Sequence, residues 1–105
     1  MKILFDQGTP VPLRDQLDEH PVDTAYENDW SGLKNSDLLD EAEKNGYDLL
    51  ITTDQNLYHQ QNLSERKITV LVLTSASWPR IQKKVDAIRV AIRELDAGSY
   101  KEITI

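Results

Sequence analysis

The stretch that decides the fold is Asp48-Leu49-Leu50-Ile51-Thr52-Thr53-Asp54. It is a continuous apolar run that ends in Thr-Thr-Asp, a pattern typical of a strand covered on both faces. Strands of this kind lie in the interior of parallel sheets, because helices cover both faces of such sheets. We therefore predict that this segment forms the central strand of an α/β domain.

Two other apolar runs predict buried strands on either side of it in the sequence. Ile3-Leu4-Phe5 has the length of a short buried strand and stops at the turn-forming residues 6–10. Residues 68–73 are apolar or β-branched throughout, which favours a strand that ends at Thr74. Alternating patterns predict two further strands, one through Val22, Thr24 and Tyr26 and one through Ile103 and Ile105.

Helical patterns fill the intervals between these strands. Leu13 and Leu17 are four residues apart, which predicts a short helix terminated by His20-Pro21. A longer helix is predicted from an N-cap at Asn35 or Ser36 to about Asn45. Its buried face is expected to consist of Leu38, Leu39 and Ala42, and Gly46 suits the left-handed residue after its end. A helical turn is also expected over residues 57–62.

The last helix has the strongest periodicity in the chain. Its apolar residues follow spacings of four, three, four and three, which predicts one amphipathic helix from about Pro79 until Gly98 stops it. These residues are Ile81, Val85, Ile88, Ile92 and Leu95. Its polar face carries Arg80, Lys83, Lys84, Arg89 and Arg93. Such a face could contact phosphates, although a solvated helix face is the more common explanation.

The alternation of strands and helices predicts one domain with three layers. We expect a mostly parallel sheet of about four to five strands, with helices on both faces and right-handed crossovers. No repeat, linker or low-complexity segment divides residues 1–105.

Composition narrows the classes of function. The chain has 18 acidic and 12 basic residues and a net charge of −6, which argues against long-range, non-specific attraction of nucleic acid. The absence of cysteine excludes disulfides, thiolate metal sites and cysteine nucleophiles. No apolar stretch approaches the roughly 20 residues of a membrane span, and the apolar start is too short for a signal peptide. We therefore expect a cytoplasmic protein with no membrane association.

Acidic residues directly follow two of the predicted strands. In parallel sheets ligands bind beyond the carboxyl ends of the strands, where Asp6 and Asp54 are expected. Asp37, at a helix start, could supply a third carboxylate. A divalent cation such as Mg²⁺ or Mn²⁺ would relieve the repulsion between these groups. The alternative is structural, since Asp after a strand commonly caps the next helix and an acid in a first helical turn favours the helix dipole.

Four blocks of sequence together resemble a known family. They are Ile3–Gln7, Trp30–Leu39, Leu50–Leu57 and Gln60–Leu63, in which Thr-Asp-Gln-Asn-Leu followed by Gln-Gln-Asn-Leu is the most specific part. This pattern resembles the small PIN-like domains of the DUF5615 type, relatives of the Mut7-C nuclease domain. The resemblance implies a compact PIN-like fold and, in active members, Mg²⁺- or Mn²⁺-dependent cleavage of RNA. It also suggests an antitoxin partner, as in toxin–antitoxin pairs, and a homodimer.

The resemblance assigns roles to individual residues. Asp6, Asp37 and Asp54 match the acids that hold the metal and serve catalysis. The residues expected to contact the substrate are Gln7, Thr53, Gln55 and Asn56. Asn56 falls where many relatives carry a further Asp, and Gln7-Gly8 falls where many read Glu-Asn. These departures remove negative charge and motivate a second hypothesis, a catalytically inactive PIN-like module that binds protein or RNA.

Two further hypotheses concern side chains near the predicted acids. Thr52 and Thr53 could donate hydrogen bonds to the carboxylates. The amide cluster after Asp54 could bind substrate, but we favour a role in holding its own loop together. This cluster consists of Gln55, Gln60, Gln61 and Asn62.

Overall fold

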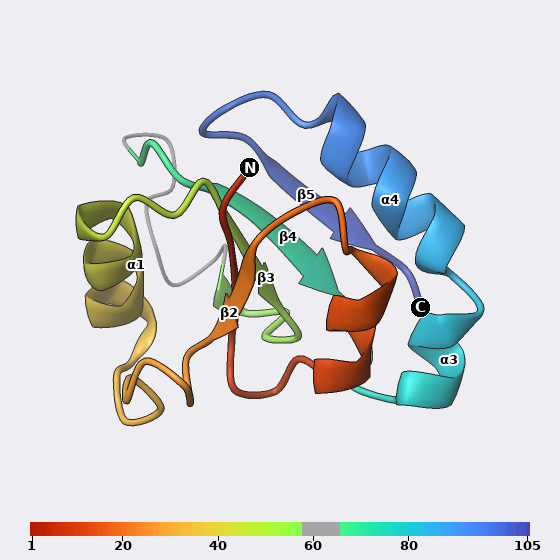
Figure 1. Cartoon of the computed structure of the whole chain (residues 1–105), viewed down its shortest axis with the longest axis horizontal. Coiled ribbons are helices and arrows are strands. Elements are labelled where there is room, and N and C mark those ends of the chain that lie inside the picture. The colour runs from red at the N-terminus through yellow and green to blue at the C-terminus, as the bar shows by residue number, and fades with distance from the viewer. Residues whose placement is uncertain (58–65) are drawn as a thin grey trace.

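The computed structural model describes residues 1–57 and 66–105 (Figure 1). Its elements, in chain order, are β1 (Ile3–Phe5), η1 (Val11–Gln16), β2 (Val22–Thr24), α1 (Asn35–Lys44), β3 (Leu49–Thr52), β4 (Thr69–Leu73), α3 (Trp78–Gln82), α4 (Val85–Glu94) and β5 (Tyr100–Ile103). A helical turn is predicted for residues 57–62. Leu57 is helical, and the other residues of this turn lie outside the described part of the chain.

The five strands form one sheet in the order β2-β1-β3-β4-β5, and every neighbouring pair is parallel. β3 is the central strand, as the sequence predicts, and all four of its residues are buried. The chain places β2 on one side of β1 and then places β3 on the other side. The strand order therefore changes direction between β1 and β3, which is where parallel α/β sheets form a crevice beyond the carboxyl ends of their strands.

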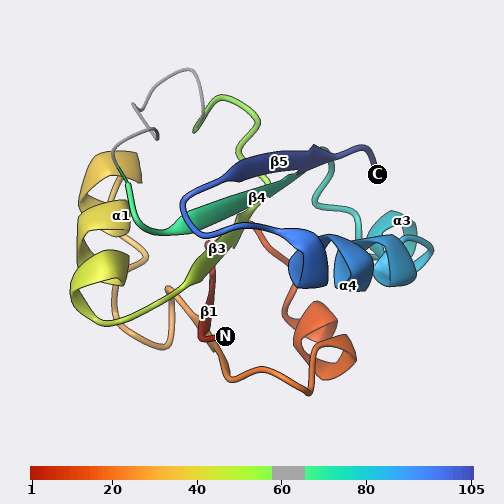
Figure 2. The ribbon, with the colours of Figure 1, turned by 90° about the horizontal axis from the view of Figure 1, so that it is seen from above.

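Helices cover both faces of this sheet, and Figure 2 shows the three layers from above. α1 packs on one face, where Leu38, Leu39 and Ala42 are buried against Leu4, Leu50 and other strand residues. η1, α3 and α4 pack on the opposite face against a cluster that includes Phe5, Ile51 and Leu71. Successive strand residues point to opposite faces, so each buried strand contributes to both cores. The predicted three-layer α/β fold is confirmed.

β2 is shorter than the alternating pattern predicts. It ends at Thr24, and Tyr26 lies in the following turn with 77% of its surface exposed. Glu27 N–H donates to Thr24 Oγ1 at 3.0 Å, and Thr24 N–H donates to Glu27 Oε1 at 3.0 Å. This reciprocal pair is the capping-box arrangement, which closes a turn and leaves no extended backbone for a longer strand. The prediction that Tyr26 belongs to the strand is therefore wrong.

The helix predicted from Pro79 is two helices, α3 and α4, separated at Lys83 and Lys84. The N–H groups of these two lysines donate to the carbonyls three residues earlier, at 3.2 and 2.8 Å. This tighter i→i+3 pattern ends α3 and lets it change direction. Ile81 and Val85 are still buried on either side of the break, because α3 packs against η1 while α4 continues along the sheet.

Smaller differences concern the ends of elements. η1 is a 3-10 helix, with Leu13 buried inside it and Leu17 buried just after it. The N-cap of α1 is Lys34, which precedes both of the predicted caps, Asn35 and Ser36. Gly46 has a φ of +81°, the left-handed conformation predicted for it. No helix among the described residues is long and apolar enough to cross a lipid bilayer.

Candidate functional site

Asp6 directly follows β1 and is held at the crevice between β1 and β3. Its N–H donates to the Ile51 carbonyl at 3.0 Å, which extends the pairing of β1 with β3 by one residue. Its carboxylate accepts two hydrogen bonds, from Gln7 N–H to Oδ1 at 2.6 Å and from Thr52 Oγ1 to Oδ2 at 2.7 Å. The carboxylate is therefore fixed from both of its oxygens before any ligand arrives.

Thr52 links the two acids that follow the strands. Its hydroxyl is fully buried, donates to Asp6 Oδ2, and accepts the backbone N–H of Asp54 at 3.0 Å. The predicted hydrogen bond from this threonine to a carboxylate is thus present. Asp54 Oδ1 accepts the N–H of Asn56 at 2.9 Å, which is the local capping role that the sequence also allows for this residue. Among the described residues, Oδ2 of Asp54 accepts no hydrogen bond.

The loop after β1 is fastened tightly to β3. Thr9 is buried, its N–H donates to the Asp6 carbonyl at 3.0 Å, and its hydroxyl donates to the Ile51 carbonyl at 2.8 Å. Gly8 lies so close to Thr53 that a Cβ at this position would be 2.6 Å from Thr53 Oγ1. The missing side chain of Gly8 therefore lets the two loops of the site approach each other.

No family model matches the chain. Comparisons with curated proteins and with solved structures likewise find no significant match.

A shallow pocket of about 260 Å³ opens beside Asp6. Its walls come from the loop after β1, from η1 and from the turn after β2, and include Asp6, Gln7, Val11, Arg14, Tyr26 and Glu27. Val11 and Tyr26 give it an apolar rim, since 55% and 77% of their surfaces are exposed. The pocket therefore joins a fixed carboxylate to an aromatic ring at the carboxyl end of the sheet.

Arg14 and Glu27 form an ion pair along the pocket. Arg14 Nη2 lies 2.6 Å from Glu27 Oε1, and Nη1 lies 3.2 Å from Oε2, so the two groups meet in the two-pronged geometry typical of arginine and a carboxylate. The hydrogen bond from Arg14, together with the one from the Thr24 backbone, lowers the pKa of Glu27. Glu27 therefore remains ionised near neutral pH and neutralises Arg14.

The structure brings together some of the predicted site residues. Asp6, Thr53 and Asp54 lie at the ends of adjacent strands, with Gln7 exposed beside them. Asp37 is exposed in the first turn of α1. In the described ranges, no three His, Asp or Glu side chains are placed to hold one metal ion, so the expected convergence of Asp37 with Asp6 and Asp54 is not observed.

The amides after Asp54 have structural contacts where they are described. Gln55 Nε2 donates to the Thr74 carbonyl at 3.0 Å and ties this loop to the end of β4, which agrees with the favoured loop-holding role. Asn56 is exposed, and its backbone caps against Asp54. Gln60, Gln61 and Asn62 lie outside the described residues.

The turn after β2 contributes to the site in a way that the sequence patterns do not predict. The sequence patterns place Tyr26 in a strand and Arg14 in a short helix, and they assign no role to Glu27. One local signal was available, because Thr24-Ala25-Tyr26-Glu27 has the Thr-x-x-Glu pattern of a capping box. The pairing of Arg14 with Glu27 had no local signal, since it depends on how η1 packs beside β2.

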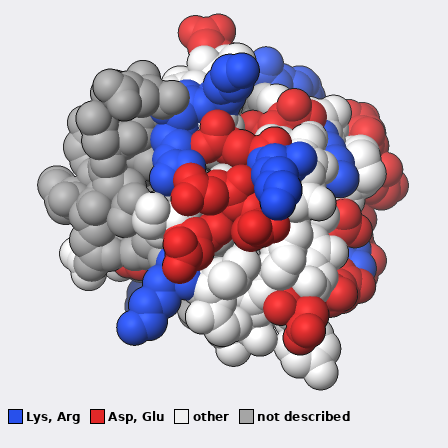
Figure 3. All heavy atoms as spheres, turned by 90° about the vertical axis from the view of Figure 1, so that its left-hand side faces the viewer, with Lys and Arg blue, Asp and Glu red and all other residues white. Residues whose placement is uncertain are grey.

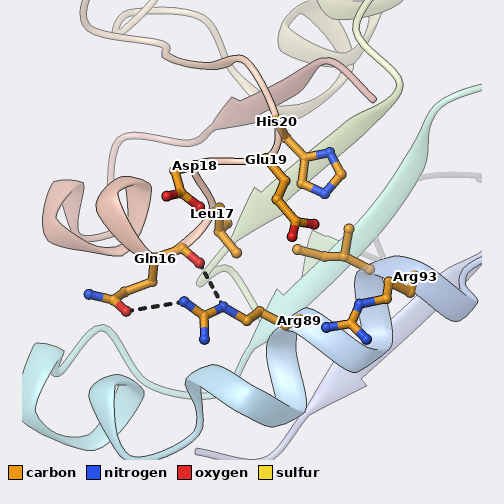
Figure 4. Close-up of a pocket in the computed structure, with 8 residues that line it drawn as sticks. Gln16, Leu17, Asp18, Glu19, His20, Arg89 and Arg93 are labelled. Atoms are coloured by element: carbon orange, nitrogen blue, oxygen red, sulfur yellow. Dashed lines mark hydrogen bonds between the residues drawn. The ribbon is translucent and has the colours of Figure 1, made fainter.

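A second pocket, of about 160 Å³, lies at the opposite end of the sheet between α4 and the segment that leads into β2 (Figure 4). Arg89 crosses it, donating from Nε to the Gln16 carbonyl at 2.8 Å and from Nη2 to Gln16 Oε1 at 3.3 Å. Part of the basic face of the late helix is thus occupied in tying α4 to the end of η1.

The outer surface of α1 is acidic. Acidic side chains gather over this layer in Figure 3, and α1 contributes Asp37, Asp40, Glu41 and Glu43. Arg66 bridges two of them, Asp40 and Glu43. This acidic surface is partly neutralised where Arg66 contacts it.

Proposed function

We propose that this protein is a divalent-metal-dependent ribonuclease of the PIN-like class that hydrolyses phosphodiester bonds of RNA at the carboxyl end of its sheet. One observation carries the proposal: Asp6 is fixed by Gln7 and Thr52 at the point where the strand order changes direction, next to Asp54. The family resemblance of the four sequence blocks independently assigns the same two acids to metal binding.

The oxygen donors at this edge suit a hard cation. Mg²⁺ is commonly bound through one or two carboxylates, with water and substrate phosphate filling its other positions. Asp6, Asp54 and the side-chain oxygen of Asn56 are the residues that would hold Mg²⁺ or Mn²⁺. When bound, the cation supplies Lewis-acid activation of water and phosphate.

The remaining chemistry falls to residues of the chain. Each carboxylate oxygen can accept about two hydrogen bonds, so Asp6 keeps acceptor capacity on both oxygens after Gln7 and Thr52 are counted. Asp54 Oδ2 can accept a proton from the attacking water and orient the oxygen of that water toward phosphorus. Thr52 positions both acids, because its one hydroxyl contacts the Asp6 carboxylate and the Asp54 backbone.

The test compares acids at the two ends of the same pair of strands. Asp6→Asn/Asp54→Asn is expected to lose RNA cleavage by on the order of 100-fold or more, since a catalytic cation contributes several kcal/mol to the transition state. Asp48→Asn is the matched control, because Asp48 Oδ2 accepts the Lys2 N–H at 2.7 Å and bridges the starts of β1 and β3. A labelled single-stranded RNA, with Mn²⁺ or with a chelator, provides the readout.

Calorimetric titration of Mn²⁺ gives a second readout. Heat of binding is expected for the wild type and for Asp48→Asn, and no heat is expected for Asp6→Asn/Asp54→Asn. Cleavage that survives in Asp54→Asn would show that the site assignment is wrong.

A second candidate function is an inactive PIN-like module that binds protein or RNA. This function is favoured because Asp6 and Asp54 both have structural roles. Asp6 joins β1 to β3, and Asp54 accepts the Asn56 N–H. In that case neither Mn²⁺ heat nor cleavage is observed. Asp54→Asn would then also leave thermal stability nearly unchanged, because Asn caps a turn about as well as Asp.

A further inference from the structure

Tyr26 is displayed on the surface by a turn that several hydrogen bonds hold in place. The capping-box pair between Thr24 and Glu27 closes the turn, and Trp30 N–H donates to the Ala25 carbonyl at 2.7 Å. Arg14 then ties Glu27 to η1. An aromatic ring with 77% of its surface exposed is therefore carried on a backbone with hydrogen bonds on both sides of it.

The ring lies on the rim of the pocket that contains Asp6. Val11, with 55% of its surface exposed, adds a second apolar side chain to the same pocket. The pocket volume of about 260 Å³ is close to the lower end of the roughly 300–1,000 Å³ found for small-molecule sites. Its size and its apolar rim suit one flat ring system.

The charges in the pocket favour a neutral ring over a phosphate. Arg14 is neutralised by Glu27, and Asp6 adds a negative charge, so this part of the surface repels anions. A nucleobase carries no charge and stacks on an aromatic ring, whereas its phosphate would remain outside, toward Asp54. A base inside a duplex is already stacked and paired and cannot present its face in this way.

We propose that Tyr26 is a stacking platform for one unpaired nucleobase of the RNA substrate, so that the base is held in this pocket while its phosphate lies outside, toward Asp54. This inference rests on the proposed ribonuclease function and names a residue that would hold one base of its substrate. Stacking on an aromatic side chain is tolerant of base identity, so we expect weak sequence preference at this position.

The experiment measures RNA binding and cleavage separately. Tyr26→Ala, Tyr26→Phe and Val90→Ala are compared with the wild type, and Val90 serves as the control because it is a partly exposed apolar residue on α4. Tyr26→Ala is expected to weaken the binding of a labelled single-stranded RNA by about tenfold, and to raise KM more than it lowers kcat. Tyr26→Phe and Val90→Ala should stay within about twofold of the wild type, since Phe retains the stacking face. A duplex of the same sequence should bind weakly to every variant.

Binding is repeated in the Asp6→Asn/Asp54→Asn background, which separates this inference from the proposed activity. If RNA binding depends on Tyr26 but neither the wild type nor any variant cleaves RNA, the stacking role of Tyr26 is supported and the ribonuclease proposal is wrong. If the wild type cleaves RNA and Tyr26→Ala binds and cleaves equally well, the ribonuclease stands and the platform is wrong. Absence of RNA binding in every variant overturns the platform as well.

Discussion

Two carboxylates bridge the same pair of strands at its two ends. At the amino end, Asp48 comes just before β3 and accepts the N–H of Lys2, which comes just before β1. At the carboxyl end, Asp6 comes just after β1 and accepts the hydroxyl of Thr52, the last residue of β3. Both groups use a hydrogen bond to hold one strand to the other.

The surroundings of the two carboxylates differ. Next to Asp48, the Lys2 ammonium lies 4.2 Å from the centre of the Tyr47 ring and donates to the Asn45 carbonyl, so charge and hydrogen-bonding groups are already used. Next to Asp6 are a second acid, Asp54, and an open pocket with an aromatic rim. A hydrogen-bonded carboxylate is thus no sign of function by itself. Asp6 differs from Asp48 because it has unused acceptor capacity and open space beside it. These two properties distinguish a candidate site from a carboxylate that only joins two strands.

The largest effect is expected for Thr52→Val, which keeps the shape of a fully buried side chain and removes its hydroxyl. The Asp54 N–H and one oxygen of Asp6 then lose their shared partner. We expect a loss of about 2 kcal/mol in the free energy of unfolding, measured by urea denaturation, because two part-buried hydrogen bonds are lost and each contributes about 0.5–1.5 kcal/mol. Cleavage of RNA should fall as well, by about tenfold, through the loss of carboxylate orientation.

Asp48→Asn tests the other side of this prediction. The amide oxygen of Asn can still accept the Lys2 N–H, and surface substitutions usually change stability by less than about 0.5 kcal/mol. A larger loss of cleavage in Asp48→Asn than in Thr52→Val would contradict the assignment of function to the carboxyl end.

Gly8→Ala crowds only the carboxyl end of the strand pair. The added Cβ would be 2.6 Å from Thr53 Oγ1, so the threonine or the loop must move. We expect a loss of about 1 kcal/mol in stability, measured by thermal or urea unfolding, as is usual for overpacking. Gly32→Ala is the matched control, because no atom lies within 4 Å of its added Cβ.

The double variant Gly8→Ala/Thr53→Ala identifies the cause. Removing Thr53 Oγ1 gives the new methyl group room, so the two substitutions should be less destabilising together than their sum. Simple additivity would show that Gly8 matters through backbone conformation instead.

At the amino end, Tyr47→Phe is expected to change stability but not activity. The Tyr47 hydroxyl donates to Asp23 Oδ2 at 2.6 Å and accepts from Asn28 Nδ2 at 2.7 Å, so its removal should cost about 1 kcal/mol without affecting RNA cleavage. Burial of the phenol, assisted by the hydrogen bond to Asp23, raises its pKa above 10.0. The folded state therefore holds this proton more tightly than the unfolded chain does.

The sign of the pH dependence follows from that shift. The stabilisation is complete below the unfolded pKa of about 10 and is lost as the pH rises from there through the folded pKa. Wild type should consequently lose more stability than Tyr47→Phe between about pH 9 and pH 11, measured as urea midpoints. Equal losses in both proteins would exclude Tyr47 as the responsible group.

The fold was largely predictable because buried strands leave an unambiguous local pattern. Residues 49–52 and 69–73 are buried throughout and apolar except for Thr52 and Thr69, and both form interior strands. Local patterns failed where polar side chains act over a turn. The alternation through Tyr26 resembles a strand, but the Thr24–Glu27 pair reverses the chain there. The break at Lys83 and Lys84 also had no local signal, because it depends on how α3 packs against η1.

The candidate site was predictable only in part. The positions of Asp6 and Asp54 follow from parallel topology, since acids after adjacent strands must lie at the same edge. The contact between Asp6 and Thr52 needs the actual register, in which Phe5 pairs with Ile51 and the next residues meet beyond the ladder. The packing of Arg14 against Glu27 likewise depends on tertiary structure. So does the position of Asp37, which forms no three-residue metal cluster with other acids or histidines among the described residues.

The hydrogen bond between Asp6 and Thr52 joins residues 46 positions apart in the chain. During synthesis, Asp6 emerges long before its partner, and closing a loop of this size costs entropy that only the finished sheet repays. A chain that ends before Leu49 therefore contains the first acid but no site. The candidate chemistry arises together with cooperative folding, so incompletely synthesised or locally folded chains cannot carry it.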